Sequence, residues 1–438
     1  MNPLSQDALS PATPRRLYLP SALLALLLLP GTTAQPQSPT SPPAKPATKA
    51  QYAQWRKQIK QALFIPETLP TVAPHNYGTF TPVDGVTAER VTYATLYGMR
   101  VPAIIYRPAK STGRIPGIVI VNGHGGDKTS WYAYYSGILY AKAGAVVVTY
   151  DPVGEDERNA THASINIHDT FIPGPQMPER MGGQMITDIL QAVSYLAQRP
   201  DVDPRRIAVA GFSMGSFHSA IAGAIAGGSD PRIHALVLSG GGNLDGPGDY
   251  WDSSPKIMCQ SGPYKALSFL TDRGADLYAL NQDRGATFIM NGTADKVVTS
   301  HNNLEPYFVT LRDRTAAVSG TRANLFETWW FPEAGHRPNF VTRPGALWLE
   351  DHLQFPNWTA ASLKALPEIS ISEWNEKSSA TTGDDNFLAV DVSVPHLIRD
   401  QLQAVPLAEW EQHKADFIYD SWVERARAAA QSTPTPSH

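Results

Sequence analysis

The sequence contains a single cysteine, Cys259, among its 438 residues. One cysteine cannot form an intramolecular disulfide, and it excludes a zinc site built from several cysteines. The sequence also lacks a large excess of either sign of charge, because it contains 36 Lys plus Arg and 40 Asp plus Glu, for a formal net charge of -4. This near balance gives no electrostatic reason to expect nucleic acid or an anionic membrane surface as a partner.

Long apolar runs are absent apart from one short run near the start of the chain, within residues 1–34. This run follows Arg15 and Arg16 and leads into small residues ending at Ala34, which is the order of a secretory signal peptide. Because the run is too short for a membrane span, we expect an exported protein with no stable membrane insertion. Export without disulfides favours a bacterial periplasm or exterior. The arginine pair also resembles a twin-arginine signal, although flanking prolines depart from that pattern and favour an ordinary export signal.

Composition divides the rest of the chain into segments. Residues 35–51 are mostly Pro, Thr, Ser and Ala, which predicts a flexible linker, with folded structure beginning near Tyr52. Residues 52–365 carry the regular apolar pattern of a catalytic domain. Residues 366–430 break that pattern and predict a C-terminal extension packed on the domain, and residues 431–438 predict a disordered tail.

The domain alternates short apolar runs with helix-like segments. Residues 88–96 and 100–106 flank Tyr97-Gly98 and predict a hairpin. The later runs are apolar along most of their length, as strands covered on both faces are; they are 115–121, 145–150, 207–210, 235–238, 286–290 and 325–331. Between them, residues 185–198 repeat apolar side chains at spacings typical of a helix. This alternation predicts an α/β fold with a doubly wound, mostly parallel sheet.

The sharpest motif is Gly211-Phe212-Ser213-Met214-Gly215, which stands directly after a predicted strand and directly before a helix rich in small residues. A G-x-S-x-G motif in that place is a nucleophile elbow, in which a tight turn raises the serine hydroxyl above the sheet. The alternative is a glycine-rich turn with an inert serine. The strand-turn-helix setting favours Ser213 as a nucleophile.

A serine nucleophile needs a base and an orienting acid, which follow it in the order acid, then histidine. Asp295 and His336 each come directly after a predicted strand, at the edge of the sheet where catalytic groups gather. We expect His336 to take the proton of Ser213 and Asp295 to hold the imidazole in the correct tautomer. The alternatives are a surface role for His336 and a helix N-cap role for Asp295, with Asp283 or Glu327 as the acid.

A glycine-rich loop at residues 122–126 follows the first parallel strand and predicts the oxyanion hole. We expect the N–H groups of Met214 and Gly126 to form it, with Gly125 as the alternative to Gly126. His124 is expected to be a structural part of the loop, because one base is enough for the mechanism.

Together these motifs resemble the α/β-hydrolase superfamily, particularly its dienelactone-hydrolase and acetyl-xylan-esterase-like branches. The resemblance spans roughly residues 90–352. Residues 151–158 also resemble the Asp-x-x-Gly-x-Gly loop of such esterases, but they carry Glu155-Asp156 where a second glycine is usual. Ser213 stands where dienelactone hydrolases proper have a cysteine.

Residues 159–183, rich in Pro, His and Met, predict a lid or rim over the site. The segment contains His162, His168 and Asp169, which are metal-ligating residue types. Because they have no cysteine partner and no helical i, i+4 pairing in the sequence, no metal site is predicted.

Aromatic residues offer a floor for a sugar or aryl group. The candidates for substrate binding are Trp131, Tyr134 and Trp251, with plain core packing as an equally weighted alternative.

These features predict an exported serine carboxylic ester hydrolase that works through an acyl-enzyme intermediate, needs no cofactor and acts on a small-molecule or carbohydrate ester, such as an acetylated sugar. The first alternative is a serine peptidase of the prolyl-oligopeptidase kind. The chain ahead of the first core strand is too short for the β-propeller of such peptidases. The second alternative is a catalytically silent scaffold used for binding, against which the ordered triad residues argue.

Overall fold

The computed structural model describes residues 46–227, 232–299, 304–320, 325–383 and 387–432. All of these belong to one structural unit, residues 44–438. The predicted signal peptide, most of the predicted linker and residues 433–438 of the predicted tail lie outside the described residues.

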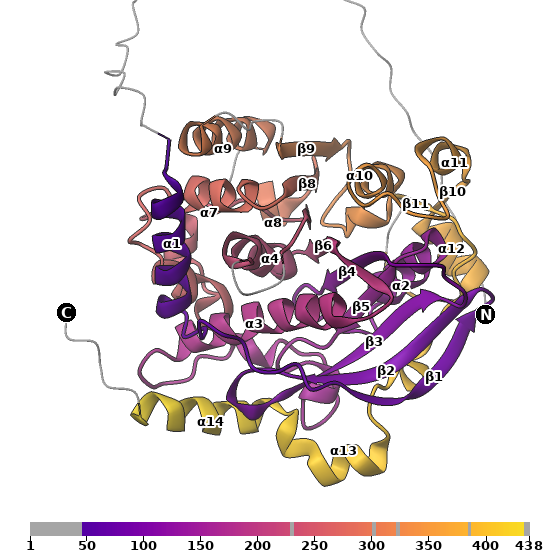
Figure 1. Ribbon diagram of the computed structural model, residues 1–438, viewed down its shortest axis with the longest axis horizontal. Helices are drawn as coiled ribbons and strands as arrows, with labels where there is room; N and C mark the ends of the chain where they lie inside the picture. Colours follow the sequence, from indigo (N-terminus) through magenta and orange to yellow (C-terminus); the bar gives the residue numbers. More distant parts are fainter. Residues whose placement is uncertain (1–45, 228–231, 300–303, 321–324, 384–386, 433–438) are drawn as a thin grey trace, which may run out of the picture. The chain divides into compact units, whose positions relative to one another are not determined.

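A nine-stranded sheet forms the centre of the unit, in the order β1-β2-β3-β5-β4-β6-β7-β8-β9 (Figure 1). Strands β1, β2, β3 and β5 pair antiparallel in turn, and the strands from β5 to β9 pair parallel. The strands are β1 His75–Val83, β2 Val86–Ala94, β3 Arg100–Pro108, β4 Ile115–Val121, β5 Val146–Tyr150, β6 Val202–Phe212, β7 Ala235–Ser239, β8 Ala286–Gly292 and β9 Phe326–Phe331. The predicted mostly parallel α/β fold, with its β2–β3 hairpin, is confirmed.

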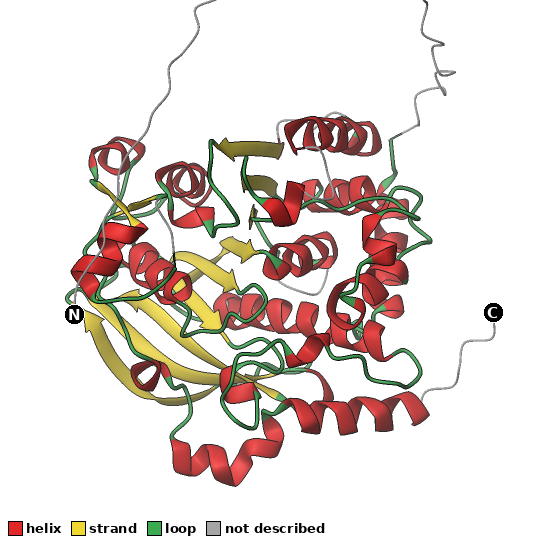
Figure 2. Ribbon diagram, turned by 180° about the vertical axis from the view of Figure 1, so that it is seen from behind, coloured by secondary structure: helices red, strands yellow, loops and turns green. Residues whose placement is uncertain are grey.

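Helices cover both faces of this sheet (Figures 1 and 2). Helices α1, α3, α4, α7 and α9 bury apolar side chains against one face, and α2, α10, α11 and α12 bury theirs against the other. The helices are α1 Lys49–Ala62, α2 Trp131–Ala143, α3 Met177–Gln198, α4 Met214–Ile225, α5 Tyr250–Ser253, α6 Gly262–Lys265, α7 Arg273–Gln282, α8 Lys296–Thr299, α9 Leu304–Ser319, α10 Arg343–Leu353, α11 Ala360–Ala365, α12 Ile371–Ser378, α13 Leu407–His413 and α14 Tyr419–Ser432. In the described part of the chain, none of them is long and apolar enough to span a membrane.

Strand β4 shows why the central strands are apolar throughout. Val119 and Val121 point into the cluster under α3 and α4, whereas Ile118 and Ile120 point into the cluster under α2. Side chains alternate between the faces of a strand, so a strand covered on both faces is apolar at every position. Full burial of each such side chain stabilises the fold by about 1.5–3 kcal/mol.

The folded chain begins earlier than the predicted start at Tyr52. The Thr48 side chain accepts a hydrogen bond from the Gln51 N–H at 3.2 Å, and the Gln51 side chain reaches back to the Thr48 N–H, which makes a capping box for α1. Just before it, the Ala47 N–H donates to the Val318 carbonyl at 2.8 Å. The predicted linker boundary is therefore wrong, because the T-x-x-Q capping signal lay inside a stretch that composition marked as a linker.

The last residues of the predicted rim segment, 177–183, belong to helix α3. Helix α3 begins at Met177, with proline at its first turn, rather than near residue 185. Residues 159–176 therefore form the irregular part, which the turn Ile167–Asp169 interrupts.

The C-terminal segment packs on the sheet and shares its core. It contains a small two-stranded sheet, β10 Glu368–Ser370 with β11 Leu388–Val390. The Tyr135 hydroxyl of α2 donates to the Val390 carbonyl at 2.8 Å, and buried Trp374 and Trp410 belong to the same apolar cluster as α2. Figure 1 shows α13 and α14 along the lower edge of the molecule, with α14 below α3, and α14 ends at Ser432, inside the predicted tail.

One fully buried lysine fixes the loop that follows β4. The Lys128 ammonium lies 2.7 Å from Asp151, 2.6 Å from Asp156 and 2.7 Å from Glu157. Burial alone would lower the pKa of Lys128, but the surrounding carboxylates raise it well above its ordinary value. Arg399 of the C-terminal segment pairs with Asp156 from the other side, so the cluster joins three distant parts of the chain.

We expect Lys128→Met to lower the free energy of unfolding by about 3–5 kcal/mol, because it leaves buried carboxylates without their cation. Urea unfolding of the two proteins measures this difference. Lys364→Met, in exposed α11, is the control and should stay within about 0.5 kcal/mol. Equal losses in both variants would contradict the assigned role of Lys128.

Candidate active site

Ser213 sits on the sharp turn between β6 and α4. Its backbone adopts φ 54° and ψ -118°, a conformation that costs energy for a residue with a side chain. The Ser213 N–H donates to the Ser239 carbonyl of β7 at 2.9 Å, which anchors the turn to the sheet. This is the strained strand-to-helix turn that the G-x-S-x-G motif predicts.

The two glycines of the motif are required by close backbone contacts. A Cβ on Gly211 would lie 2.5 Å from the Gly215 carbonyl oxygen, and a Cβ on Gly215 would lie 2.3 Å from the Val121 carbonyl oxygen. Both distances are far below van der Waals contact. Helix α4 therefore starts directly against the end of β4 only because both positions lack side chains.

His336 and Asp295 come together next to Phe212, the residue before Ser213. The His336 Nδ1 atom lies 2.8 Å from Asp295 Oδ2, and Asp295 is fully buried whereas the His336 side chain is 23% exposed. The His336 ring lies against the Phe212 ring with centroids 4.9 Å apart, next to the elbow. A buried carboxylate on Nδ1 orients the imidazole and leaves Nε2 for proton transfer.

The alternative acids lie in other contacts. Asp283 pairs with Arg56 at 2.9 Å, and Glu327 accepts a hydrogen bond from Trp348 Nε1 at 3.0 Å. Asp295 also fulfils its alternative role, because its Oδ1 atom accepts the N–H groups of Val297 and Val298 at the start of α8. One oxygen caps the helix while the other holds His336, so the two interpretations of Asp295 are compatible.

The loop after β4 differs from its prediction at Gly126. The Gly126 N–H donates to the Gly123 carbonyl at 3.0 Å and closes a turn, so it is not available to an oxyanion. The assignment of Gly126 is therefore wrong. Gly125 has φ +68° and faces the Asn166 side chain, whereas His124 and Met214 line the pocket beside Ser213.

A pocket of about 120 Å³ opens at Ser213. The loop after β7, residues 240–244, forms one wall, and Gln260 of the π-helix Ile257–Ser261 with the preceding Lys256 forms another. It is lined by His124, Ser213, Met214, Phe217, Gly240, Gly241, Gly242, Asn243, Leu244, Tyr250, Trp251, Lys256, Gln260, Val297 and Val298. Its small size and mixed lining suit a short substrate group with polar substituents.

The three predicted aromatic residues separate into two groups. Trp251 lines the pocket, with its ring 4.7 Å from Phe217 and its Nε1 donating to the Asn243 carbonyl at 2.8 Å. Trp131 and Tyr134 instead pack against Trp374 of α12, at centroid distances of 5.8 and 6.3 Å. Their predicted part in substrate binding is wrong, because the C-terminal segment covers this face of α2.

Sequence reasoning missed a polar group behind the pocket wall. Asp169 accepts hydrogen bonds from the Cys259 thiol at 2.7 Å and from Lys256, and its Oδ1 lies 3.2 Å from His124 Nε2. Burial alone would raise the pKa of Asp169, but these partners hold it below its ordinary range. Burial and the nearby Asp169 raise the pKa of the Cys259 thiol. No metal site was predicted because these residues have no cysteine partner nearby in the sequence. That reason is wrong, because Cys259 contacts Asp169 although it lies 90 positions further along the chain.

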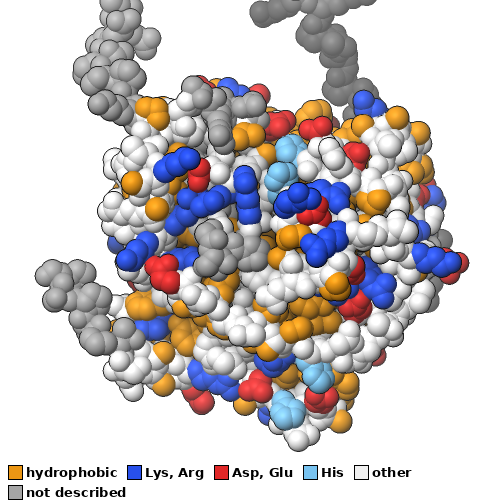
Figure 3. Space-filling view, in the orientation of Figure 1, with side chains coloured by type: hydrophobic (Ala, Val, Ile, Leu, Met, Phe, Trp, Pro, Cys, Tyr) orange, Lys and Arg blue, Asp and Glu red, His pale blue; other side chains and the backbone are white. Residues whose placement is uncertain are grey.

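Larger cavities lie away from the elbow. One of about 420 Å³ beside α1 is lined by Arg56, Lys57, Lys60 and Arg284, and Figure 3 shows Lys and Arg side chains on this face. Another, of about 620 Å³, borders β9 and includes Trp329 and Arg337. Neither is lined by Ser213, Asp295 or His336.

Two curated relatives match parts of the chain. The uncharacterized peptidase YuxL of Bacillus subtilis (strain 168) is 32% identical over 133 residues, which are 30% of this chain and 18% of the relative. Thiohydrolase apmlB of Arthrinium phaeospermum is 30% identical over 152 residues, 34% of this chain and 42% of the relative. The matched segments thus span less than half the length of each relative.

One solved structure shares the fold, and a second is similar over part of the chain. Methylesterase BT1017 is 18% identical with a TM-score of 0.57, covering 87% of this chain and 74% of its own. An acetyl xylan esterase from Paenibacillus sp. R4 is 14% identical with a TM-score of 0.46, covering 71% of this chain and 97% of its own. At this identity the likeness concerns the fold alone; the predicted resemblance to the α/β-hydrolase superfamily is confirmed by the family match that follows.

The model of the prolyl oligopeptidase family matches residues 128–363. This stretch is more than half of the 438 residues, and it contains Ser213, Asp295 and His336 in the order that α/β-hydrolases use. The chain belongs to the prolyl oligopeptidase family.

Proposed function

We propose that the protein is an exported carboxylic ester hydrolase that acts on a small-molecule or carbohydrate ester through an acyl-enzyme intermediate. The observation that carries the proposal is the 2.8 Å contact between His336 Nδ1 and buried Asp295, next to the strained turn at Ser213. Export rests on the signal-like residues 1–34.

The three side chains take the roles of a serine hydrolase. His336 Nε2 removes the proton of the Ser213 hydroxyl as its oxygen attacks the ester carbonyl, and then returns that proton to the leaving alcohol. Asp295 stabilises the imidazolium that forms between these steps. In the second half, His336 activates a water that hydrolyses the acyl-enzyme and frees Ser213.

The oxyanion that forms during attack needs two donors. The Met214 N–H, at the start of α4, belongs to the first turn of a helix, where N–H groups have no partner within the helix. We assign the second donor to the backbone of His124, because His124 lines the pocket with Ser213 while the Gly126 N–H is used in a turn. Donors fixed before reaction stabilise the developing charge without reorganisation.

The pocket favours a short acyl group. Its volume of about 120 Å³ lies below the several hundred Å³ typical of sites for larger ligands. Lys256 and Gln260 supply polar contacts at its wall, which suit the hydroxyl or carboxyl substituents of a sugar ester. The methylesterase that shares the fold is named for esters of a small alcohol, which supports an ester substrate without indicating the acyl length.

Peptide cleavage is the second candidate function, because the chain belongs to the prolyl oligopeptidase family. The same triad chemistry cleaves amides, so substrate comparison separates the two candidates. A panel of p-nitrophenyl acetate to decanoate, acetylated xylan and a prolyl peptide anilide, assayed with the purified protein, provides this comparison.

We expect cleavage of the short esters, and Ser213→Ala should lower kcat by about 10⁴-fold or more because the nucleophilic oxygen is gone. Circular dichroism of both proteins checks that the fold is retained. Cleavage of the anilide alone would favour the peptidase, and ester cleavage that survives Ser213→Ala would contradict the proposal.

Asp295→Asn should lower kcat by about 10⁴-fold, because an amide at this position stabilises the wrong tautomer of His336 and cannot offset the imidazolium charge. Steady-state kinetics on p-nitrophenyl acetate measures the loss. Asp283→Asn is the matched control, since Asp283 pairs with Arg56. Near-normal turnover of Asp295→Asn would show that another group orients the base.

Trp251→Phe should shift the preference toward longer acyl chains, because a smaller ring leaves room in the pocket. One methylene in an apolar pocket changes discrimination by about 10-fold or more, so the butyrate to acetate ratio of kcat/KM should rise by about that factor. Trp131→Phe is the control, since Trp131 packs against α12 and should leave the ratio unchanged. A ratio that moves equally in both variants would argue against Trp251 as a pocket wall.

A further inference from the structure

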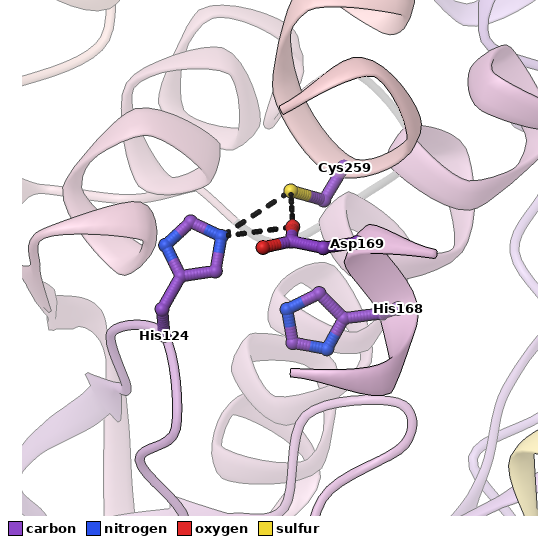
Figure 4. A group of neighbouring side chains, drawn as sticks. All are labelled: His124, His168, Asp169 and Cys259. Atoms are coloured by element: carbon purple, nitrogen blue, oxygen red, sulfur yellow. Dashed lines mark hydrogen bonds and ion pairs between the residues drawn. The ribbon is translucent and has the colours of Figure 1, made fainter. Parts of the chain in front are cut away.

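Four metal-ligating side chains from three separate segments meet behind the pocket wall (Figure 4). His124 comes from the loop after β4, His168 and Asp169 come from the turn Ile167–Asp169, and Cys259 comes from the π-helix Ile257–Ser261. One ligand atom from each lies within 4.8 Å of the other three. Such convergence of separate segments on one point is what a metal site requires.

His168 supplies an independent sign that a ligand belongs at this point. The side chain is fully buried, and its Nε2 atom has no hydrogen-bond partner among the described residues. Its Nδ1 atom is held by the Val153 carbonyl at 3.0 Å, and Figure 4 shows the other ring nitrogen turned toward the group. Buried polar atoms are rarely left unpaired, so the lack of a partner for Nε2 among the described residues points to a bound cation.

The donor set identifies the class of metal. Two imidazole nitrogens, one thiolate sulfur and one carboxylate oxygen are the donors of a tetrahedral zinc site, whereas magnesium and calcium prefer oxygen alone. We propose that His124, His168, Asp169 and Cys259 bind one Zn²⁺ ion in a closed structural site. Four protein ligands leave no open position, which distinguishes it from a catalytic zinc site.

Two of the distances between ligand atoms already suit a tetrahedral ion. Zinc bonds of about 2.0–2.3 Å place neighbouring ligand atoms roughly 3.3–3.7 Å apart. His124 Nε2 lies 3.3 Å from Cys259 Sγ and 3.2 Å from Asp169 Oδ1. Cys259 Sγ lies 2.7 Å from Asp169 Oδ1 because the thiol donates a hydrogen bond to it. On binding, the thiol proton leaves to solvent, the sulfur becomes a thiolate ligand, and this pair moves apart by less than 1 Å.

The surrounding residues match the outer shell of a zinc site. Glu155 Oε1 lies 3.2 Å from His168 Nδ1, the carboxylate-histidine arrangement that fixes the tautomer of a zinc-bound histidine. Lys256 contacts Asp169 Oδ2, which leaves Oδ1 for the metal. The ion would thus join the rim segment, the loop after β4 and the π-helix that carries Gln260 into the pocket wall.

The first test uses the full chain without substitutions. The protein is stripped with a chelator, and its metal content is measured by mass spectrometry after it is refilled with Zn²⁺ or Co²⁺. We expect one ion per chain, tetrahedral cobalt bands in the visible spectrum and a thiolate-to-cobalt band in the near ultraviolet. Binding well below one ion per chain, or cobalt binding with no thiolate band, would overturn the proposal.

Variants assign the ligands. Cys259→Ser should remove the thiolate band, and Glu155→Gln should weaken Zn²⁺ affinity by about 10–100-fold through His168. His413→Asn, on the exposed side of α13, is the control and should leave affinity unchanged. Zn²⁺ affinity that is unchanged in both Cys259→Ser and Glu155→Gln would contradict the site. None of these measurements depends on ester cleavage. The cobalt spectrum of the unsubstituted chain still tests the proposal if a variant fails to fold.

Discussion

A run of four buried charges, Glu155 to Arg158, organises the walls around Ser213. All four side chains are fully buried. A buried charge without a partner costs several kcal/mol, so each of them must find one, and together the four find partners in four separate segments. Glu155 meets His168 of the rim, Asp156 meets Lys128 and Arg399, Glu157 meets Lys128 and the N–H groups of Ala404 and Val405, and Arg158 meets Asp188 of α3. The rim, the loop after β4, helix α3 and the C-terminal segment are therefore positioned by one stretch of backbone at the end of β5.

The same run explains the departure from the Asp-x-x-Gly-x-Gly pattern. Asp156 occupies the place where a second glycine is usual, and its φ of 41° keeps the left-handed conformation that glycine adopts readily. Aspartate tolerates this conformation better than most residues with a Cβ. The strain is offset by the two cations that its carboxylate holds, so the loop keeps its shape while gaining the anchor for the C-terminal segment. The C-terminal segment is thus part of the site's support rather than an addition to a finished domain.

Features carried by local sequence were predictable, whereas those created by distant contacts were not. The parallel strands are apolar runs, and the elbow at Ser213 follows from glycines whose neighbours leave no room for a Cβ, so both could be predicted. Strand β1 was not predicted, because its side chains are largely exposed and form no apolar run. Trp131 was placed in the pocket because nothing local reveals that Trp374 covers it. Cys259 lies 90 positions from Asp169, and no spacing rule brings the two together.

His124 connects the two kinds of chemistry that we propose. His124 lines the pocket together with Ser213, and its Nε2 atom faces Cys259 and Asp169. The loop that carries it is held at its far end by Lys128 and in its middle by the Gly126 to Gly123 hydrogen bond. An ion bound to the ring would fix the remaining free part of this loop. Because an oxyanion hole is effective only when its donors are held in place before charge develops, a structural metal behind the wall would serve ester cleavage without touching the substrate.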